Sequence, residues 1–175
     1  MVSETTDPLA ISRNPEFMRL ALAEAALVVD EVFPYPPVGC LVIHGGHIVA
    51  RAHNGKPGSG TPHAEIAALL EAQKRKYPMS ETVVYSSLEP CCVIGLTQSC
   101  SQALIDCGVK EVHVGVEDSY GLIRGKGIRH LQDAGITVVL GEYQREIRHL
   151  LRFYEARFCP SCGHPVMNGR EGAPK

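Results

Sequence analysis

The sequence contains no tryptophan, and aromatic residues make up only 6% of its 175 residues. Its 17 basic and 19 acidic residues leave a formal net charge of −2, and the lysines and arginines are spread along the chain. Proteins that hold nucleic-acid strands combine basic grooves with aromatic side chains on which bases stack. The composition therefore argues against nucleic acid as the main partner.

Long apolar runs are also missing. No run approaches the roughly 20 residues that a transmembrane helix needs. The opening stretch MVSETTDPLAISRN is polar and has no apolar run after a basic start, so it does not read as a secretory signal. We therefore expect a cytoplasmic protein with no membrane partner, and the length suits one domain with its own hydrophobic core.

The seven cysteines are an odd number. Disulfides are rare in a reducing compartment, where cysteines more often bind metals, act in catalysis or fill the core. Cys40 and Cys107 fall in a predicted strand and near the end of a predicted helix, so core packing explains both. The segment LEPCCVIGLTQSC, residues 88–100, holds three more cysteines, and we ask which of them bind a metal.

Hydrophobic periodicity predicts an α/β fold, a three-layer α/β/α sandwich around a mixed five-stranded sheet. The first two strands form a hairpin across Gly45 and Gly46, and the later alternation of strand and helix implies parallel pairing. The predicted helices cover residues 15–33, 63–76, 100–108, 128–135 and 144–158, and the predicted strands 38–43, 47–53, 82–88, 111–117 and 136–143.

One domain is expected over residues 1–158, followed by a short tail over residues 159–175. The tail begins with CPSCGH, in which Cys159, Cys162 and His164 have the spacing of half a zinc ribbon. The chain has no second CxxC that could complete such a site. Two readings stay open, a second, structural zinc site and a tail that binds no metal.

The tetrapeptide PHAE at residues 62–65 precedes the cysteine-rich segment of residues 88–100. His63 and Glu65 stand at a predicted helix start, where both can reach an atom beyond the helix end. Cys91 follows the end of a predicted strand and Cys100 begins the next helix, whose N-terminus favours thiolate over thiol. One imidazole and two thiolates leave the fourth position of a zinc ion to water, as in catalytic sites. A carboxylate such as that of Glu65 can then move protons.

His-Ala-Glu followed by Pro-Cys and a later cysteine resembles the signature of the zinc deaminases of the cytidine deaminase superfamily. Most members close this motif as PCxxC, whereas here the gap after Cys91 is longer. That gap is similar to the deaminase domain of the bifunctional riboflavin-biosynthesis protein. So are PPVGC at 36–40, GGHIVARAH at 45–53, ALIDCGVKEVHVG at 103–115 and GKGIRHLQDAGITV at 125–138. The resemblance covers residues 15–142.

The resemblance implies that His63, Cys91 and Cys100 hold Zn²⁺ and that Glu65 is the catalytic proton shuttle, with Cys92 outside the ligand set. A zinc-bound hydroxide would attack the ring carbon that bears an exocyclic amine, and ammonia would leave. The family also implies a homodimer or larger homo-oligomer. The expected substrate-binding residues are Tyr35, Val38, His53, Val93, Leu96 and Tyr120.

Four of these positions depart from the riboflavin branch. Tyr35 replaces an asparagine, Val93 a small polar residue and Leu96 a lysine or arginine, and Tyr120 belongs to a segment, DSYG at 118–121, where the branch has DPNP. A buried substrate group that loses its partner costs roughly 1–3 kcal/mol. The sequence therefore predicts a zinc-dependent hydrolase of a different cyclic amidine, such as a nucleobase, nucleoside, nucleotide or aminopyrimidine.

Three alternatives remain. The first is the riboflavin-pathway diaminohydroxyphosphoribosylaminopyrimidine deaminase itself, and the second is a tRNA or single-stranded DNA base editor. The third is a zinc-bound protein without catalysis, for which loss of the shuttle carboxylate would be the usual sign. Because Glu65 is present, catalysis is favoured.

Overall fold

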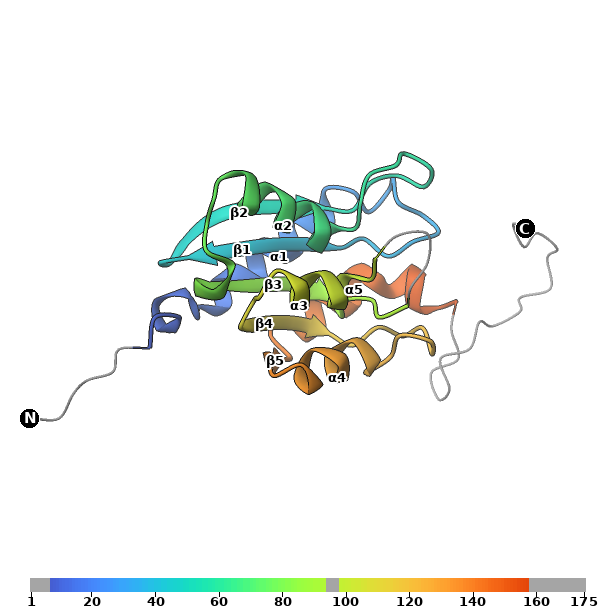
Figure 1. The fold of residues 1–175 in the computed structure, drawn as a ribbon. Coiled ribbons are helices and arrows are strands. Elements are labelled where there is room, and N and C mark those ends of the chain that lie inside the picture. Colours follow the sequence, from blue (N-terminus) through green and yellow to red (C-terminus); the bar gives the residue numbers. More distant parts are fainter. Residues whose placement is uncertain (1–6, 94–97, 158–175) are drawn as a thin grey trace, which may run out of the picture.

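The computed structural model describes residues 7–93 and 98–157, and its centre is a five-stranded sheet with strand order β2-β1-β3-β4-β5 (Figure 1). β1 pairs antiparallel with both β2 and β3, whereas β3, β4 and β5 run parallel to one another. The strands are β1 (Gly39–His44), β2 (His47–His53), β3 (Thr82–Leu88), β4 (Glu111–Val116) and β5 (Thr137–Leu140). This confirms the predicted mixed sheet.

Helices cover both faces of the sheet, as the sequence predicts (Figure 1). One layer holds α1 and α5, and the other holds α2, α3 and α4, which contact one another in that order. The helices are α1 (Pro15–Ala26), α2 (Ala64–Lys74), α3 (Cys100–Asp106), α4 (Lys126–Asp133) and α5 (Gln144–Glu155), with short 3₁₀ turns at Ala10–Ser12 and Met79–Glu81. Within the described ranges, none of the helices has the length and apolar character needed to cross a membrane.

The first helix is shorter than its hydrophobic pattern predicts. It ends at Ala26, and residues 27–33 form turns instead of helix. At this point the amides of Leu27 and Val28 bond to carbonyls three residues back, which tightens and then ends the helix. Val28 and Val32 are still buried, so periodic burial continued beyond the helix and misled the prediction.

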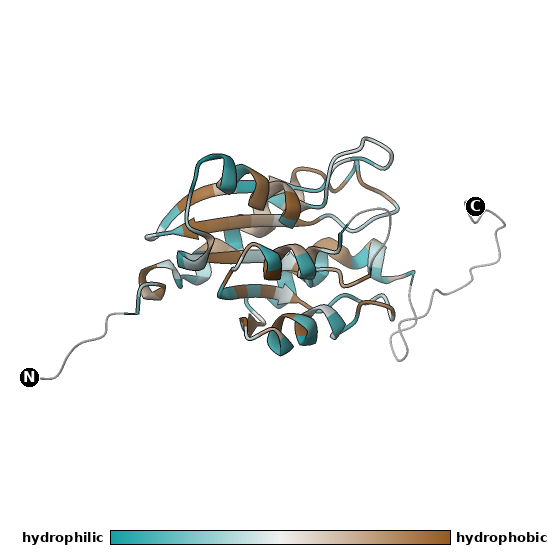
Figure 2. Ribbon diagram, viewed as in Figure 1, coloured by the Kyte–Doolittle hydropathy of each residue, from teal (hydrophilic) through white to brown (hydrophobic). Residues whose placement is uncertain are grey.

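The core lies between the sheet and its two helical layers. Figure 2 shows hydrophobic colour along β1 and polar colour on the outward faces of the helices. Gly39 permits α1 to approach β1 closely, because a Cβ there would lie 2.0 Å from the carbonyl oxygen of Ala21. This close packing fixes the start of β1, which lies beside the end of β3 because the two strands are antiparallel.

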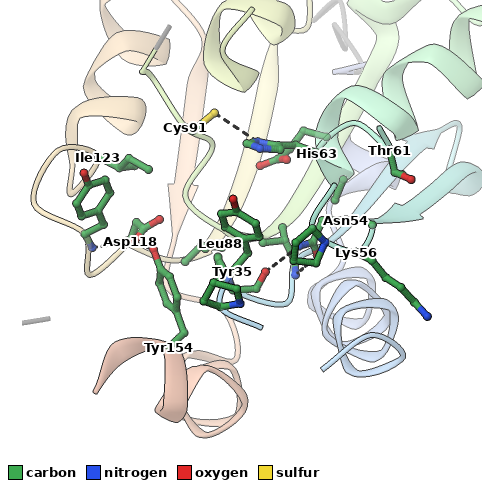
Figure 3. A pocket seen from close by; sticks show the side chains of 18 of the residues that line it. Tyr35, Asn54, Lys56, Thr61, His63, Leu88, Cys91, Asp118, Ile123 and Tyr154 are labelled. Atoms are coloured by element: carbon green, nitrogen blue, oxygen red, sulfur yellow. Dashed lines mark hydrogen bonds between the residues drawn. The ribbon is translucent and has the colours of Figure 1, made fainter. Parts of the chain in front are cut away.

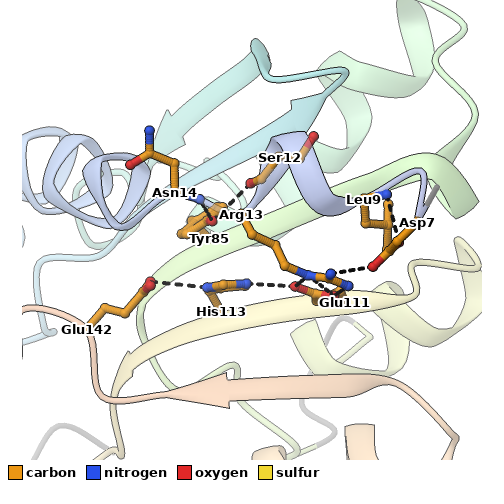
Figure 4. A network of polar contacts seen from close by, with 9 residues as sticks. All are labelled: Asp7, Leu9, Ser12, Arg13, Asn14, Tyr85, Glu111, His113 and Glu142. Atoms are coloured by element: carbon orange, nitrogen blue, oxygen red, sulfur yellow. Dashed lines mark hydrogen bonds and ion pairs between the residues drawn. The ribbon is translucent and has the colours of Figure 1, made fainter. Parts of the chain in front are cut away.

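A polar network around the buried side chains of Glu111 and His113 joins the segment before α1 to the sheet (Figure 4). Glu111 of β4 accepts hydrogen bonds from Arg13 at 2.6–2.9 Å and lies 2.8 Å from Nε2 of His113. Nδ1 of His113 lies 3.1 Å from a carboxylate oxygen of Glu142. The Tyr85 ring packs on the imidazole with centroids 4.3 Å apart. The network thereby joins the segment before α1 to β3, β4 and the residues after β5.

Replacing Glu111 with glutamine should lower the free energy of unfolding at neutral pH. The loss should be much smaller at acidic pH. Burial raises the pKa of the Glu111 carboxyl, but hydrogen bonds from Arg13 and His113 outweigh it and the net pKa lies below the ordinary 4.5. A carboxyl with a lowered folded pKa stabilises above its unfolded pKa, and that stabilisation is lost as pH falls through the folded value. We expect a loss of about 1–3 kcal/mol at pH 7.

Urea unfolding of the parent protein and of Glu111→Gln between pH 7 and pH 3 measures this difference. The matched control is Glu16→Gln, which removes an exposed carboxylate paired with Arg19 and should change stability little. A stability difference that is the same at every pH would show that the charge of Glu111 is not what stabilises the network.

Candidate metal centre

His63 and Glu65 stand at the N-terminus of α2. His63 is the N-cap residue and Glu65 lies in the first helical turn. His63 is exposed and lines the cavity, whereas only 3% of Glu65 is exposed. A cap residue sits outside the helix, so its side chain is free to turn toward an atom beyond the helix end. The structure therefore places both residues at the start of α2, where both line the same cavity.

Cys91 and Cys100 come together because the first turn of α3 binds the Cys91 residue. The backbone amide of Cys100 donates to Sγ of Cys91 at 3.4 Å. The amide and the hydroxyl of Ser101 both donate to the carbonyl oxygen of Cys91 at 3.0 Å. Ser99 is the N-cap of α3, and its hydroxyl accepts from the amide of Gln102 at 3.3 Å. The helix start thus fixes both the sulfur and the backbone of Cys91.

The three expected ligand atoms form a compact group. Nδ1 of His63 lies 3.6 Å from Sγ of Cys91 (Figure 3). It lies 3.2 Å from Sγ of Cys100, and the three ligand atoms lie within 4.8 Å of one another. One imidazole nitrogen and two sulfurs are donors that suit zinc, with one tetrahedral position left for another ligand. The donor set therefore fits a catalytic zinc ion.

Cys92 lies outside this group although it is next to Cys91. Its sulfur contacts the carbonyl oxygen of Leu122 at 3.9 Å, in the loop that follows β4. The group of His, Cys, Asp and Glu side chains in the described part of the chain that could hold a metal consists of His63, Cys91 and Cys100. This arrangement supports the assignment of Cys92 as a bystander.

Local electrostatics favour a thiolate at Cys91. A hydrogen bond with the Cys100 thiol, followed by one with His63, lowers the pKa of Cys91 to about 4. The hydrogen bond with Cys91 also raises the pKa of His63. Metal ligands must be deprotonated to bind, so a ready thiolate lowers the proton cost of metal binding.

Glu65 lies beside the ligand group without belonging to it. Its Oε1 atom accepts from the Ser86 hydroxyl at 3.3 Å, and its carboxyl also interacts with the Cys100 thiol. Burial, followed by the charge of Cys91, raises the pKa of Glu65. A carboxyl group with a raised pKa next to a metal position is suited to accept and return a proton.

A cavity of about 590 Å³ opens onto His63, Glu65 and Cys91 (Figure 3). This volume lies within the range of small-molecule sites. Of the substrate-binding residues that the sequence predicts, Tyr35, Val38 and Tyr120 line the cavity.

His53 and Val93 are described but are not among the residues that line the cavity. His53 instead has its Nδ1 atom 3.4 Å from a carboxylate oxygen of Glu24, and Val93 is 45% exposed. Leu96 lies outside the described residues, and so does the tail with Cys159, Cys162 and His164. A role for Leu96 in substrate binding and a second zinc site therefore stay predictions.

Sequence reasoning missed several polar residues of the cavity wall. Asn54 is one: its Oδ1 accepts from the amide of Val38 at 2.8 Å, and its Nδ2 donates to the carbonyl of Pro36 at 2.9 Å. Its position directly after β2 and before a glycine-rich loop was the available signal. The others lie on the loops after β2, β3 and β4 and at or just beyond the end of α5, and they are Lys56, Thr61, Glu89, Asp118, Tyr154 and Arg157.

The model of the family described as the cytidine and deoxycytidylate deaminase zinc-binding region matches residues 11–116. The chloroplastic riboflavin biosynthesis protein PYRD of Zea mays is 37% identical over 81% of this chain and 35% of its own length. The riboflavin biosynthesis protein RibD of Actinobacillus pleuropneumoniae is 38% identical over 75% of this chain and 34% of its own length. The chain thus spans about a third of the length of these relatives.

Solved structures agree with this likeness. The diaminohydroxyphosphoribosylaminopyrimidine deaminase/5-amino-6-(5-phosphoribosylamino)uracil reductase of Thermotoga maritima superposes with a TM-score of 0.75 at 31% identity, covering 80% of this chain and 39% of that protein. A tRNA:A34 deaminase superposes with a TM-score of 0.64 at 23% identity, covering 79% of this chain and 100% of the other. The second likeness concerns the fold alone.

Replacing Cys91 with serine should remove one zinc ion per chain relative to the parent protein, because one of three protein ligands is lost. The matched control is Cys92→Ser, which alters the neighbouring sulfur and should leave the zinc content unchanged. Metal analysis of the purified proteins measures the zinc content per chain. Because both variants keep the same tail, any zinc bound by the tail cancels when their zinc contents are compared. Equal zinc loss in both variants would contradict the ligand set.

Proposed function

Because the chain belongs to the cytidine and deoxycytidylate deaminase family, we propose that it is a zinc-dependent hydrolytic deaminase of a small heterocyclic amine. The single observation that carries this proposal is the meeting of His63, Cys91 and Cys100 with the buried carboxyl of Glu65 at one end of the cavity. A bound Zn²⁺ would supply an activated water at neutral pH and a Lewis acid.

The roles of the protein's own residues follow from their positions. His63, Cys91 and Cys100 are proposed as the metal ligands. Glu65 is proposed to take the proton of the attacking water and to deliver it to the departing amine, since its carboxyl is buried beside the ligands without joining them. The cavity walls hold the heterocycle against this point and exclude bulk water.

The substrate class is supported by the size and lining of the cavity. About 590 Å³ accommodates a base together with a sugar or a similar substituent. Tyr35, Tyr120 and Ile123 line the cavity and offer flat or apolar surfaces for a ring. Tyr35 stands where the riboflavin branch has an asparagine, which favours a substrate different from that of the branch.

A second candidate is the riboflavin-pathway deaminase. It is favoured by the 37–38% identity to proteins named for riboflavin biosynthesis. A nucleic-acid base editor is the weaker alternative, because the net charge is −2 and the basic residues are dispersed. We further propose a homodimer or larger assembly in the cytoplasm, which light scattering of the purified protein and localisation of a tagged chain would test.

An ammonia-release screen of free bases, nucleosides, nucleotides, pterins and aminopyrimidine phosphates should find one amine that is turned over. The aminopyrimidine phosphate of the riboflavin pathway is the decisive compound. Its turnover at an ordinary enzymatic rate would assign the chain to that pathway, and its rejection beside turnover of another amine would support the different substrate. Absence of turnover across the whole screen would contradict a deaminase of this class.

Replacing Glu65 with alanine should lower kcat by about 10²–10⁴-fold while zinc stays bound, because the proton shuttle is lost and the ligands are not. The matched control is Glu71→Ala on the same helix, where an exposed carboxylate pairs with Arg75 and loss of the pair costs little. Ammonia release and zinc content are measured together. Undiminished turnover by Glu65→Ala would rule out the proposed mechanism.

A further inference from the structure

Glu89, two residues before Cys91, has a buried carboxylate that accepts hydrogen bonds from backbone amides. Only 3% of the residue is exposed, and none of the ion pairs in the described ranges includes it. An isolated buried carboxylate is costly unless several donors surround it. Here four backbone amides supply those donors, which indicates a specific structural task.

Each carboxylate oxygen of Glu89 has a separate task. Oε2 accepts from the amides of Asp118 at 3.1 Å and Gly125 at 2.8 Å, near the two ends of the loop of residues 117–125. Oε1 accepts from the amides of Gly127 at 2.8 Å and Ile128 at 3.2 Å, in the first turn of α4. One oxygen thus closes the 117–125 loop and the other holds the helix that follows it.

The residues next to α4 in the sequence do not supply a side chain that caps its first-turn amides. The N-cap residue of α4 is Gly125, which has no side chain to accept from the first-turn amides. A carboxylate at this position satisfies those amides and also interacts favourably with the positive end of the helix dipole. Glu89 therefore caps α4 from a different segment of the chain.

Two further contacts join the Glu89–Pro90 segment to the end of β4 and to the start of α4. The amide of Glu89 donates to the carbonyl of Val116 at the end of β4, at 2.9 Å. Gly127 packs directly on Pro90, because a Cβ on Gly127 would lie 1.9 Å from the carbonyl oxygen of Pro90. The start of α4 is therefore seated on the residue that immediately precedes Cys91.

The 117–125 loop forms one wall of the cavity. Asp118, Tyr120 and Ile123 line the cavity, and Asp118 is buried with Oδ1 accepting from the Tyr120 amide at 2.8 Å and the Tyr154 hydroxyl at 2.9 Å (Figure 3). Tyr154 belongs to α5, so the wall extends from the loop to the last helix. A shift of the loop would move all of these groups relative to the metal ligands.

We propose that Glu89 is a positioning residue that fixes this substrate-facing wall relative to the metal centre, an inference that rests on the proposed deaminase function. The carboxylate contacts neither the ligand sulfurs nor the imidazole in its hydrogen bonds. Its loss should therefore affect how substrate is held more than how the metal is held. A merely structural role would lower stability without separating KM from kcat.

Glu89→Gln tests the clamp without requiring turnover. The amide group of glutamine directs hydrogens at one pair of backbone donors, so hydrogen exchange of peptides covering residues 117–128 should become about 10-fold faster or more. The matched control is Glu117→Gln, which neutralises an acid of the same loop that makes none of the four bonds. Trypsin should also cleave faster after Arg124 in Glu89→Gln alone, with the site identified by mass spectrometry.

The link to substrate is measured with the amine that the parent protein turns over. In Glu89→Gln we expect KM to rise about 10-fold or more, kcat to change less than about 3-fold and zinc content to stay at the parent level. If Glu89→Gln fails to fold, Glu89→Asp keeps the charge and shortens the reach, and should give the same changes at a smaller size.

Unchanged exchange over residues 117–128, or a fall in kcat with unchanged KM, would overturn the positioning role. Failure of the proposed function would look different, because the parent protein itself would release no ammonia in the screen. The exchange measurement on both glutamine variants would still decide whether Glu89 holds the loop.

Discussion

The site depends above all on the bonds between Cys91 and the first turn of α3. The sulfur and the carbonyl oxygen of Cys91 are both occupied by donors of Cys100 and Ser101. These bonds bring together two cysteines separated by eight residues, and they do so at a helix end, where amides have no partner within the helix.

The mixed sheet brings the other parts of the site to the same edge. β3 and β4 are parallel, so the segments that follow them emerge side by side. β1 runs antiparallel to β3, so the residues before β1 reach that edge as well. The cavity is therefore built from the approach to β1, the loop after β2, the start of α2 and the loops after β3 and β4, with α5 closing one side.

The two carboxylates near the ligands are buried for different purposes. Glu65 faces the ligand group and has few donors around it, which suits a group that exchanges protons. The Glu89 carboxylate accepts from four backbone amides, which suits a group that stays in place, and the residue also lines the cavity. The two side chains have the same chemistry, so it does not distinguish these roles. The number of hydrogen-bond donors around each carboxylate does distinguish them. Two buried carboxylates with different hydrogen-bond partners thus lie near the proposed metal ligands.

The sequence by itself determined the order of the elements and the mixed sheet, because hydrophobic periodicity is a local signal that can be read directly. Its resemblance to the zinc deaminases singled out His63, Glu65, Cys91 and Cys100, and the structure brings the imidazole of His63 and the sulfurs of Cys91 and Cys100 together. The prediction from periodicity was wrong after Ala26, because Val28 and Val32 are buried although they lie outside the helix.

Only the tertiary structure decided the wall of the cavity. Asp118 and Tyr154 are 36 residues apart and meet through packing of α5, and Glu89 caps a helix that begins 37 residues later at Lys126. No local pattern encodes such pairs, because the capping residue and the helix it caps belong to different segments. Which side chains face the cavity depends on how α5 and the 117–125 loop dock on the sheet, and that is a property of the whole fold.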